Sequence, residues 1–182
     1  LESAQDHLHL EYYKFVDDEI GSKIIDILCK KAQEGVEVRL ICDSIGSSDL
    51  SGGAIARLKQ SGVEIFFYNP VIFTQLANKV NYRDHRKIAL VDGRIGFLGG
   101  INVSDYYINL PEKEDYWRDT HCMIEGQAVW YLQILFLLNW YFVSKQLIKP
   151  SPKYLPVIDD IPQGVATMMV ESSPDSDSQN LM

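Results

Sequence analysis

The chain has 182 residues, of which 46% are hydrophobic and 23% charged, and this length and composition suit one globular domain with a substantial core. The formal net charge of -8 argues against a nucleic-acid partner, because such partners usually require a basic face. Contact with an anionic membrane surface would likewise require a locally basic site.

The first part of the chain alternates predicted strands and helices. Residues 1–7 are expected to end a helix. Strands are expected at 9–15, 36–42 and 63–68, and helices at 17–34 and 52–60. In the first complete helix, Ile20, Ile24 and Leu28 recur at helical spacing. Strands joined by helices favour right-handed crossovers and a parallel sheet, so the sequence predicts an α/β fold.

The stretch 81–102 reads NYRDHRKIALVDGRIGFLGGIN and predicts a hairpin. Asp92-Gly93 is a strong two-residue turn signal between two apolar runs. A two-residue turn pairs Val91 with Arg94. A bulge would shift this register by one residue.

In this register the hairpin gathers polar and small residues at its open end. They are Arg83, His85, Lys87, Gly99, Gly100 and Asn102. His85 falls opposite Gly100, and the first three side chains share one strand face because they are two residues apart. The glycines are expected to leave room for a ligand beside His85.

These residue types suit phosphate chemistry. A neutral imidazole such as His85 is a nucleophile or base near pH 7. The positive charge of Lys87 and the amide of Asn102 can hold phosphate oxygens as negative charge builds on them. The alternative is a half-buried strand with a hydrogen-bonded histidine and a solvated lysine.

After the hairpin, the sequence predicts a loop at 104–115, a strand at 117–126 and a helix at 127–146. The helix contains the apolar run AVWYLQILFLLNWYFV, which is shorter than the ~20 residues that a membrane span requires. Gln133 and Asn139 also interrupt it, so we favour a core helix.

The end of the chain is expected to be less regular. Residues 149–162 contain four prolines and predict a linker, 165–170 form a candidate strand, and 171–182 are polar and expected to be mobile. The three cysteines, Cys29, Cys42 and Cys122, are widely separated in apolar contexts, which indicates reduced core residues. His7 and His9 show no metal-ligand context.

The motif His85-x-Lys87-x4-Asp92, followed by Gly99-Gly100-x-Asn102, resembles the HKD motif of the phospholipase D superfamily. Within it, HLEYYKFVDDEIG, VRLICDSIGS and WRDTHCMIEG resemble, in the same order, the first catalytic half of bacterial cardiolipin synthases. The tail VESSPDSD resembles the segment that opens the second half. The resemblance covers almost the whole chain.

The resemblance implies a phospholipase D-like α/β/α sandwich, with a mixed, largely parallel sheet flanked by helices. Residues 1–148 would form the first HKD half, and 149–182 a linker and the entry to a missing second half. It also implies amino-terminal membrane segments absent from this chain, and a bacterial inner (cytoplasmic) membrane location for the intact protein.

The implied activity is a phosphatidyltransferase that makes cardiolipin from two phosphatidylglycerols through a phosphatidyl-histidine, without metal or other cofactor. Its expected partners are phosphatidylglycerol or another phospholipid, and a second HKD half or a second chain; no nucleic acid is expected. With one motif, this chain carries half a site and is expected to be incomplete or inactive alone. The alternatives are a single-motif homodimeric phosphodiesterase or nuclease, and a non-catalytic phosphate-binding relative.

The resemblance also implies residue roles. His85 is the nucleophile or the acid/base, while Lys87 and Asn102 hold phosphate oxygens. Asp92 either supports the catalytic residues from behind or is structural, since the hairpin places it at the turn, away from His85. Asp119 orients the catalytic imidazole, the alternative being an ion pair with Arg118.

Other residues are assigned supporting roles. Arg83, Gly99 and Gly100 are expected to contact substrate. Asp43 ends a strand where open parallel sheets place ligands, and His121 is either a support of the site or a core histidine. Apolar side chains in the loop 69–80 either pack on the core or contact acyl chains.

Overall fold

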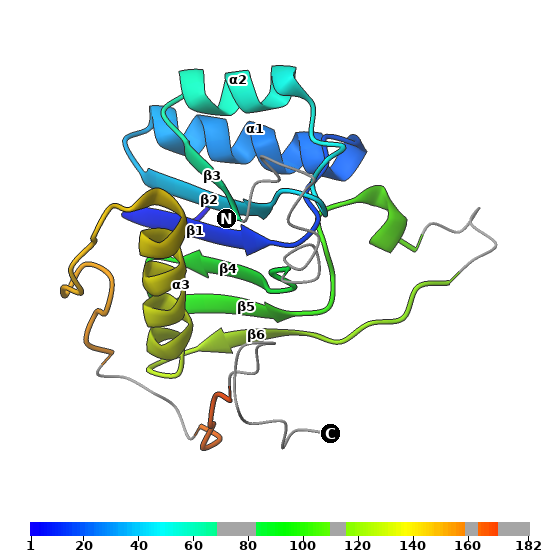
Figure 1. Cartoon of the computed structure of the whole chain (residues 1–182). Helices are drawn as coiled ribbons and strands as arrows, with labels where there is room; N and C mark the ends of the chain where they lie inside the picture. Colours follow the sequence, from blue (N-terminus) through cyan, green and yellow to red (C-terminus); the bar gives the residue numbers. More distant parts are fainter. Residues whose placement is uncertain (69–82, 110–115, 159–163, 171–182) are drawn as a thin grey trace, which may run out of the picture.

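The computed structural model describes residues 1–68, 83–109, 116–158 and 164–170. Its elements, in order, are β1 (His7–Tyr12), α1 (Glu19–Gln33), β2 (Glu37–Asp43), α2 (Gly52–Gln60), β3 (Glu64–Tyr68), β4 (Lys87–Val91), β5 (Ile95–Gly99), η2 (Asp105–Tyr107), β6 (His121–Glu125) and α3 (Val129–Ser144). Helices α1 and α2 cover one face of the sheet, and α3 crosses the other (Figure 1).

The described strands form one sheet in the order β3-β2-β1-β4-β5-β6. Strands β1, β2 and β3 are parallel, as expected from their helical crossovers. Strands β4, β5 and β6 run antiparallel to their neighbours, so parallel pairing is confined to one half of the sheet. This mixed sheet between helices confirms the predicted α/β/α sandwich.

Helix α1 illustrates how local sequence sets the boundaries. The Asp18 side chain accepts a hydrogen bond from the Gly21 amide and caps the first turn. Ile25 and Leu28 are buried against the sheet. Gly35, with φ of 91°, ends the helix in the left-handed conformation that glycine adopts without strain.

Helix α3 is apolar on all sides but is buried on only one. Val129, Leu132, Phe136 and Trp140 pack on the sheet. Its outward side exposes Tyr131, Ile134, Leu138, Tyr141 and Phe142. The core-helix prediction therefore holds for the inner side only. Among the described residues, no helix has the length and apolar character needed to cross a bilayer.

The hairpin register differs from the prediction by one residue. Arg94 donates its amide to the Val91 carbonyl, closing a turn in which Asp92 and Gly93 both have positive φ. Strand pairing nevertheless joins Val91 to Ile95. The extra residue after the turn shifts all later pairs by one.

Several other predictions were wrong. Residues 1–7 do not end a helix, because β1 begins at His7 and pairs with β2 and β4 on both sides. Residues 165–170 form no strand. Cys29 and Cys42 are buried as expected, but Cys122 is exposed on β6, the last strand of the described sheet. The predicted apolar contacts of 69–80 lie outside the described residues.

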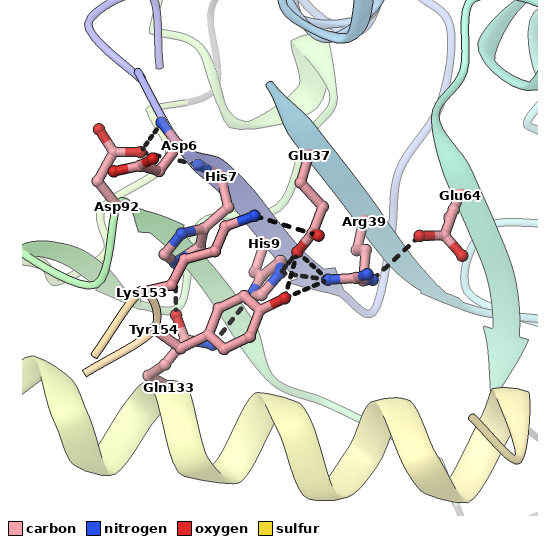
Figure 2. A network of polar contacts seen from close by, with 10 residues as sticks. All are labelled: Asp6, His7, His9, Glu37, Arg39, Glu64, Asp92, Gln133, Lys153 and Tyr154. Carbon is pink, nitrogen blue, oxygen red and sulfur yellow. Dashed lines mark hydrogen bonds and ion pairs between the residues drawn. The ribbon is translucent and has the colours of Figure 1, made fainter. Parts of the chain in front are cut away.

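A polar network centred on Glu37 lies where β1 and β2 begin side by side (Figure 2). Tyr154 donates its hydroxyl to Glu37 at 2.8 Å, and Lys153 donates to the same carboxylate at 3.3 Å. Arg39 pairs with Glu37 as well. Tyr154 is only 8% exposed, so this part of the predicted linker is packed on the domain. We call these four residues together with His9 the Glu37 network.

Two buried histidines join β1 to α3 (Figure 2). His7 Nε2 lies 3.1 Å from the side-chain oxygen of Gln133, whose amide nitrogen lies 2.8 Å from His9 Nδ1. The His9 ring also stacks on Phe136, with 4.4 Å between ring centroids. Burial lowers the pKa of His9 to about 3. These histidines therefore serve packing between the sheet and α3.

Candidate functional site

The predicted site residues gather at one edge of the sheet, which we call the site edge. It is formed by the ends of β1, β2 and β5 and the starts of β4 and β6. Tyr12 pairs with Cys42 on one side and Lys87 on the other, while Gly99 pairs with His121. Because Ile88 pairs with Leu98, the same register places Lys87 opposite Gly99.

His85 and Lys87 are held beside Tyr13. His85 precedes β4, is exposed, and stacks on the Tyr13 ring with 4.1 Å between centroids. Lys87 Nζ donates to the His85 carbonyl and lies 5.2 Å from the centre of the Tyr13 ring. Tyr13 thus brings an accessible imidazole and an ammonium group together, as the motif predicted.

Lys87 carries its charge in a partly buried place. Burial lowers the pKa of Lys87, and the carboxylates of Asp84 and Asp119 oppose that shift. The two carboxylates favour the ammonium form, which is the form that can bind a phosphate oxygen.

Asn102 is buried, and both ends of its amide are engaged. Its oxygen accepts the Lys14 amide at 3.0 Å, and its nitrogen donates to the Tyr107 hydroxyl at 2.6 Å. The Asn102 side-chain oxygen is bound by a backbone amide, whereas its nitrogen is bound by a side chain on η2. A phosphate oxygen bound by Asn102 would therefore replace the Tyr107 hydroxyl as acceptor.

Asp119 is exposed just before β6, not within the strand as predicted. Its carboxylate accepts the Thr120 amide at 2.7 Å and the Trp117 indole at 3.3 Å. A Cβ atom on Gly100 would lie 2.1 Å from Asp119 Oδ1. Within the described parts of the chain, no hydrogen bond joins Asp119 to His85, and no ion pair joins it to Arg118.

The two glycines make room for side chains of the chain itself. A Cβ on Gly99 would lie 2.6 Å from His121 Nδ1, much as one on Gly100 would meet Asp119. The space predicted to be open for ligand is thus occupied from the β6 side. The sequence pattern identified the need for glycine correctly but not its reason.

Residues 83–86 are not in a strand, so the alternation expected to place Arg83 on one face with His85 and Lys87 does not apply there. The Arg83 guanidinium lies 3.8 Å from the carboxylate of Asp43 and donates to the Ser44 hydroxyl at 3.2 Å. Asp43 is fully buried at the end of β2. The predicted support role of Asp43 at the strand end fits this contact with Arg83.

Asp92 lies at the turn, at the far end of β4 from His85. Its carboxylate accepts the backbone amides of Gln5, Asp6 and His7 at 2.8–2.9 Å. The motif aspartate thus fixes the chain that leads into β1.

An aromatic wall beside the site was not predicted. Trp117 packs on Tyr106 and Tyr107, each with 5.1 Å between ring centroids. The Asn109 side chain bonds both backbone groups of Trp117 and fixes this contact. The only sequence signal was the density of aromatics, which does not reveal contacts between separate segments.

A buried acid beneath the site was also missed. Glu11 is fully buried on β1, and burial together with the neighbouring Asp84 raises its pKa well above the usual range. Asn139 on α3 donates to it at 2.7 Å, and Arg86 lies 3.8 Å away. Its neighbours come from distant segments, so local sequence gave no sign of it.

The described residues contain no group of three or more His, Cys, Asp or Glu side chains placed to hold a metal ion. The site edge brings together an imidazole, an ammonium group and an amide, from His85, Lys87 and Asn102. Together these groups can bind a phosphodiester and stabilise charge on its oxygens.

Comparison with protein families matches residues 1–115 to the cardiolipin synthase, PLD-like domain. A cardiolipin synthase of Geobacillus thermodenitrificans is 43% identical over 177 residues, which is 96% of this chain and 35% of that protein. Cardiolipin synthase 1 of Bacillus anthracis is 40% identical over 187 residues, covering 100% of this chain and 37% of that protein. The chain thus spans about a third of these relatives.

Solved structures are similar in fold. Nuc, a phospholipase D family member from Salmonella typhimurium, has a TM-score of 0.54 at 16% identity, over 78% of this chain and 82% of that one. Phosphatidylserine synthase from Haemophilus influenzae has a TM-score of 0.56 at 17% identity, over 77% and 32%. These likenesses concern the fold alone.

Proposed function

Since this chain belongs to the family of cardiolipin synthase PLD-like domains, we propose that it supplies one half of a phosphatidyltransferase site that makes cardiolipin from two phosphatidylglycerols. The observation that carries this proposal is the meeting of His85 and Lys87 beside Tyr13, with Asn102 and Asp119 on the neighbouring segments of the site edge.

In the first step, a nitrogen of His85 attacks the phosphorus of one phosphatidylglycerol. A phosphorus–nitrogen bond forms as the bond to the headgroup glycerol breaks, and an acid from the other half protonates the leaving oxygen. In the second step, that acid from the other half, now deprotonated, removes a proton from a hydroxyl of a second phosphatidylglycerol. That oxygen attacks phosphorus, releases His85 and yields cardiolipin. If the roles of the two halves are exchanged, the nucleophile comes from the other half and His85 is the acid/base.

Lys87 and Asn102 stabilise the charge that builds on the phosphate oxygens. The ammonium group of Lys87 does so from a partly buried position, where electrostatic interactions are stronger than in water. Asn102 contributes its amide nitrogen by exchanging the Tyr107 hydroxyl for a phosphate oxygen.

We assign Asp119 the orientation of an imidazole during the reaction, a role that requires a rearrangement of His85 or Asp119, since no hydrogen bond joins them among the described residues. The influence of Asp119 on the pKa of Lys87 supports its closeness to the site. In the resting arrangement Asp119 instead receives the indole of Trp117.

The proposed site is completed by a second HKD half, from the remainder of the natural protein or from a second chain. The share of the relatives that this chain covers, 35–37%, supports the first source. Because the proposed substrate is a bilayer lipid, we propose a membrane location for the natural protein, at the bacterial inner (cytoplasmic) membrane. No cofactor enters the proposed steps.

The test is the natural protein with His85→Ala, assayed on phosphatidylglycerol vesicles for cardiolipin and released glycerol. Because the nucleophile or acid/base is lost, turnover should fall about a thousandfold or more. Unchanged thermal unfolding serves as the control for folding, which we expect because His85 is exposed. Retained cardiolipin synthesis would overturn the proposal. Phosphatidic acid without cardiolipin would indicate a hydrolase instead.

A further inference from the structure

A cluster of ionisable side chains lies beneath His85, on the face of the sheet that α3 covers. Glu11 on β1 is fully buried, and Asp84 is only 4% exposed. Arg86 Nη1 lies 3.2 Å from Oδ1 of Asp84 and 3.8 Å from Oε1 of Glu11. Asn139, on α3, donates its side-chain amide to the same Glu11 oxygen at 2.7 Å. We call Glu11, Asp84, Arg86 and Asn139 the Glu11 cluster.

The Glu11 cluster contains two carboxyl groups and one guanidinium. Within the described residues, the ion pairs of Glu11 and of Asp84 both go to Arg86. One guanidinium balances one carboxylate, and a second buried carboxylate beside it would be uncompensated, which is costly. One of the two carboxyl groups is therefore expected to be protonated, since burial and a neighbouring negative charge both disfavour the ionised form.

The hydrogen bonds identify Glu11 as the protonated group. Asp84 accepts from the backbone and the side chain of Arg86, at 3.1 Å and 3.2 Å, as a carboxylate does. In Glu11, Oε1 accepts from Asn139, whereas Oε2 is buried and has no hydrogen-bond partner among the described residues. A proton on Oε2, donated to the neighbouring Asp84, would give this oxygen a partner. Burial and then the charge of Asp84 raise the pKa of Glu11, in agreement with this assignment.

The Glu11 cluster holds the backbone on both sides of His85. The Asp84 carboxylate spans His85 by accepting the Arg86 backbone amide. The Asp84 amide donates to Asp43 at 3.2 Å, and the Arg86 carbonyl accepts the Tyr13 amide at 3.1 Å. Because residues 83–86 are not in a strand, these contacts set the path of the backbone that carries the imidazole.

We propose that Glu11 is a positioning residue for the proposed reaction: it holds one proton at neutral pH, donates it to Asp84, and so fixes the segment that carries His85. Glu11 is not a catalytic residue, because it is buried on the α3 side of the sheet and its contacts are with the protein itself. The inference rests on the proposed function, since it concerns the placing of the His85 imidazole against phosphorus or against a hydroxyl.

The first test compares two replacements of Glu11 in the natural protein, assayed on phosphatidylglycerol vesicles. Glu11→Gln imitates the protonated acid, because its amide can donate to Asp84 and accept from Asn139, so kcat should stay within about threefold of the wild type. Glu11→Met has a similar length but no hydrogen bond. Its kcat should fall at least about tenfold through displacement of His85, while KM should change by less than about twofold, because the proposed phosphate-binding groups remain.

The second test detects the proton itself. The infrared absorption of a protonated carboxylic acid is separate from that of a carboxylate, so the difference spectrum between wild type and Glu11→Gln at neutral pH should show the loss of a buried protonated acid. Glu37→Gln is the matched control at the opposite end of the strands. The pKa of Glu37 lies below its usual range, so its replacement should remove a carboxylate absorption and leave kcat unchanged.

The outcomes separate the two proposals. Cardiolipin synthesis that survives His85→Ala overturns the proposed function, and with it a positioning role in this reaction. Where synthesis depends on His85, the role of Glu11 alone is overturned by wild-type kcat in Glu11→Met, by a loss in Glu11→Gln as large as in Glu11→Met, or by a difference spectrum that shows no protonated acid. Thermal unfolding of each variant follows folding. If Glu11→Met does not fold, the kcat and the spectrum of Glu11→Gln still decide.

Discussion

At the scale of single residues, the site edge depends on two glycines that admit side chains from a neighbouring segment. Gly100 lies under the carboxylate of Asp119, and Gly99 lies under the His121 ring. Any side chain at either position would push apart groups at the site edge. Contacts within the protein should therefore decide which substitutions Gly99 and Gly100 tolerate.

Gly100→Ala tests this argument. The new Cβ would lie 2.1 Å from Asp119 Oδ1, far inside any allowed contact, so Asp119 must move. We expect phosphatidylglycerol turnover to fall at least about tenfold, because a displacement of about 1 Å near a reacting centre has effects of this size. The measurement is kcat/KM of the natural protein, with folding followed by circular dichroism.

Gly52→Ala provides the control for Gly100→Ala. A Cβ at Gly52, the first residue of α2, would meet nothing within 4 Å. That variant should keep full turnover and be as stable as the wild type or slightly more so. Full turnover by Gly100→Ala would show that Asp119 can shift without consequence, and its proposed orienting role would be untenable.

At the scale of elements, ionisable side chains on β1 and β2 form the contacts to α3 and to residues 153–154. Burial alone would raise the pKa of Glu37, but hydrogen bonds from His9 and Tyr154 and the charge of Arg39 outweigh it, so the pKa lies below the usual range. The pKa of His9 is lowered to about 3 by burial. Both groups bind fewer protons in the folded chain than in the unfolded one.

Acid should therefore weaken the fold. Between pH 6.5, the ordinary pKa of histidine, and about pH 3, unfolded His9 is protonated while folded His9 is not. The free energy of unfolding falls through that window, by about 2 kcal/mol from pH 7 to pH 5 for this one group. Stabilisation by the Glu37 carboxylate is present above its ordinary pKa of 4.5 and is lost as pH falls below it.

Urea unfolding of this chain at pH 7 and pH 5 measures the effect. His9→Gln should be less stable at pH 7, because Gln133 and Phe136 lose their partner, but should lose about 2 kcal/mol less than the wild type on acidification. His85→Gln, at an exposed position, is the matched control for replacing a histidine by glutamine. An undiminished pH dependence in His9→Gln would contradict this account.

The elements also show where sequence reasoning succeeds and where it stops. Helix α2 was predicted with its observed bounds, because a serine cap and a following glycine are local signals. The hairpin was predicted one residue out of register, since the turn residues do not reveal whether an extra residue follows them. The start of β1 was missed because both faces of that strand are buried, which removes the usual alternation.

The candidate site also contains residues that the sequence located and contacts that it did not predict. The motif located His85, Lys87 and Asn102, whose roles remain predictions. The expected strand alternation does not reach Arg83, which lies beside Asp43 in a segment that is not a strand. Contacts such as that of Asn102 with Tyr107 depend on where separate segments meet. Such contacts follow from the fold, and no local pattern predicts them.

At the scale of the whole molecule, the described domain is complete as a sandwich but carries a single motif. The sequence holds one H-x-K-x4-D pattern, at His85, and the proposed reaction needs a nucleophile and an acid/base. His7 and His9 cannot supply the second group, because both are buried against α3. The domain should therefore bind substrate without turning it over.

Turnover by this chain alone tests that expectation. With dihexanoyl phosphatidylglycerol we expect neither cardiolipin nor free glycerol, because the proposed reaction takes its second acid/base group from another HKD half. Two chains that complete one site would instead give turnover that rises with the square of chain concentration at low occupancy. At concentrations where most chains are paired, an excess of His85→Ala would then lower the activity of a fixed amount of wild type, because mixed pairs lack one of the two histidines. Such second-order, His85-dependent turnover would contradict the half-site expectation and make a second copy of this chain the missing half.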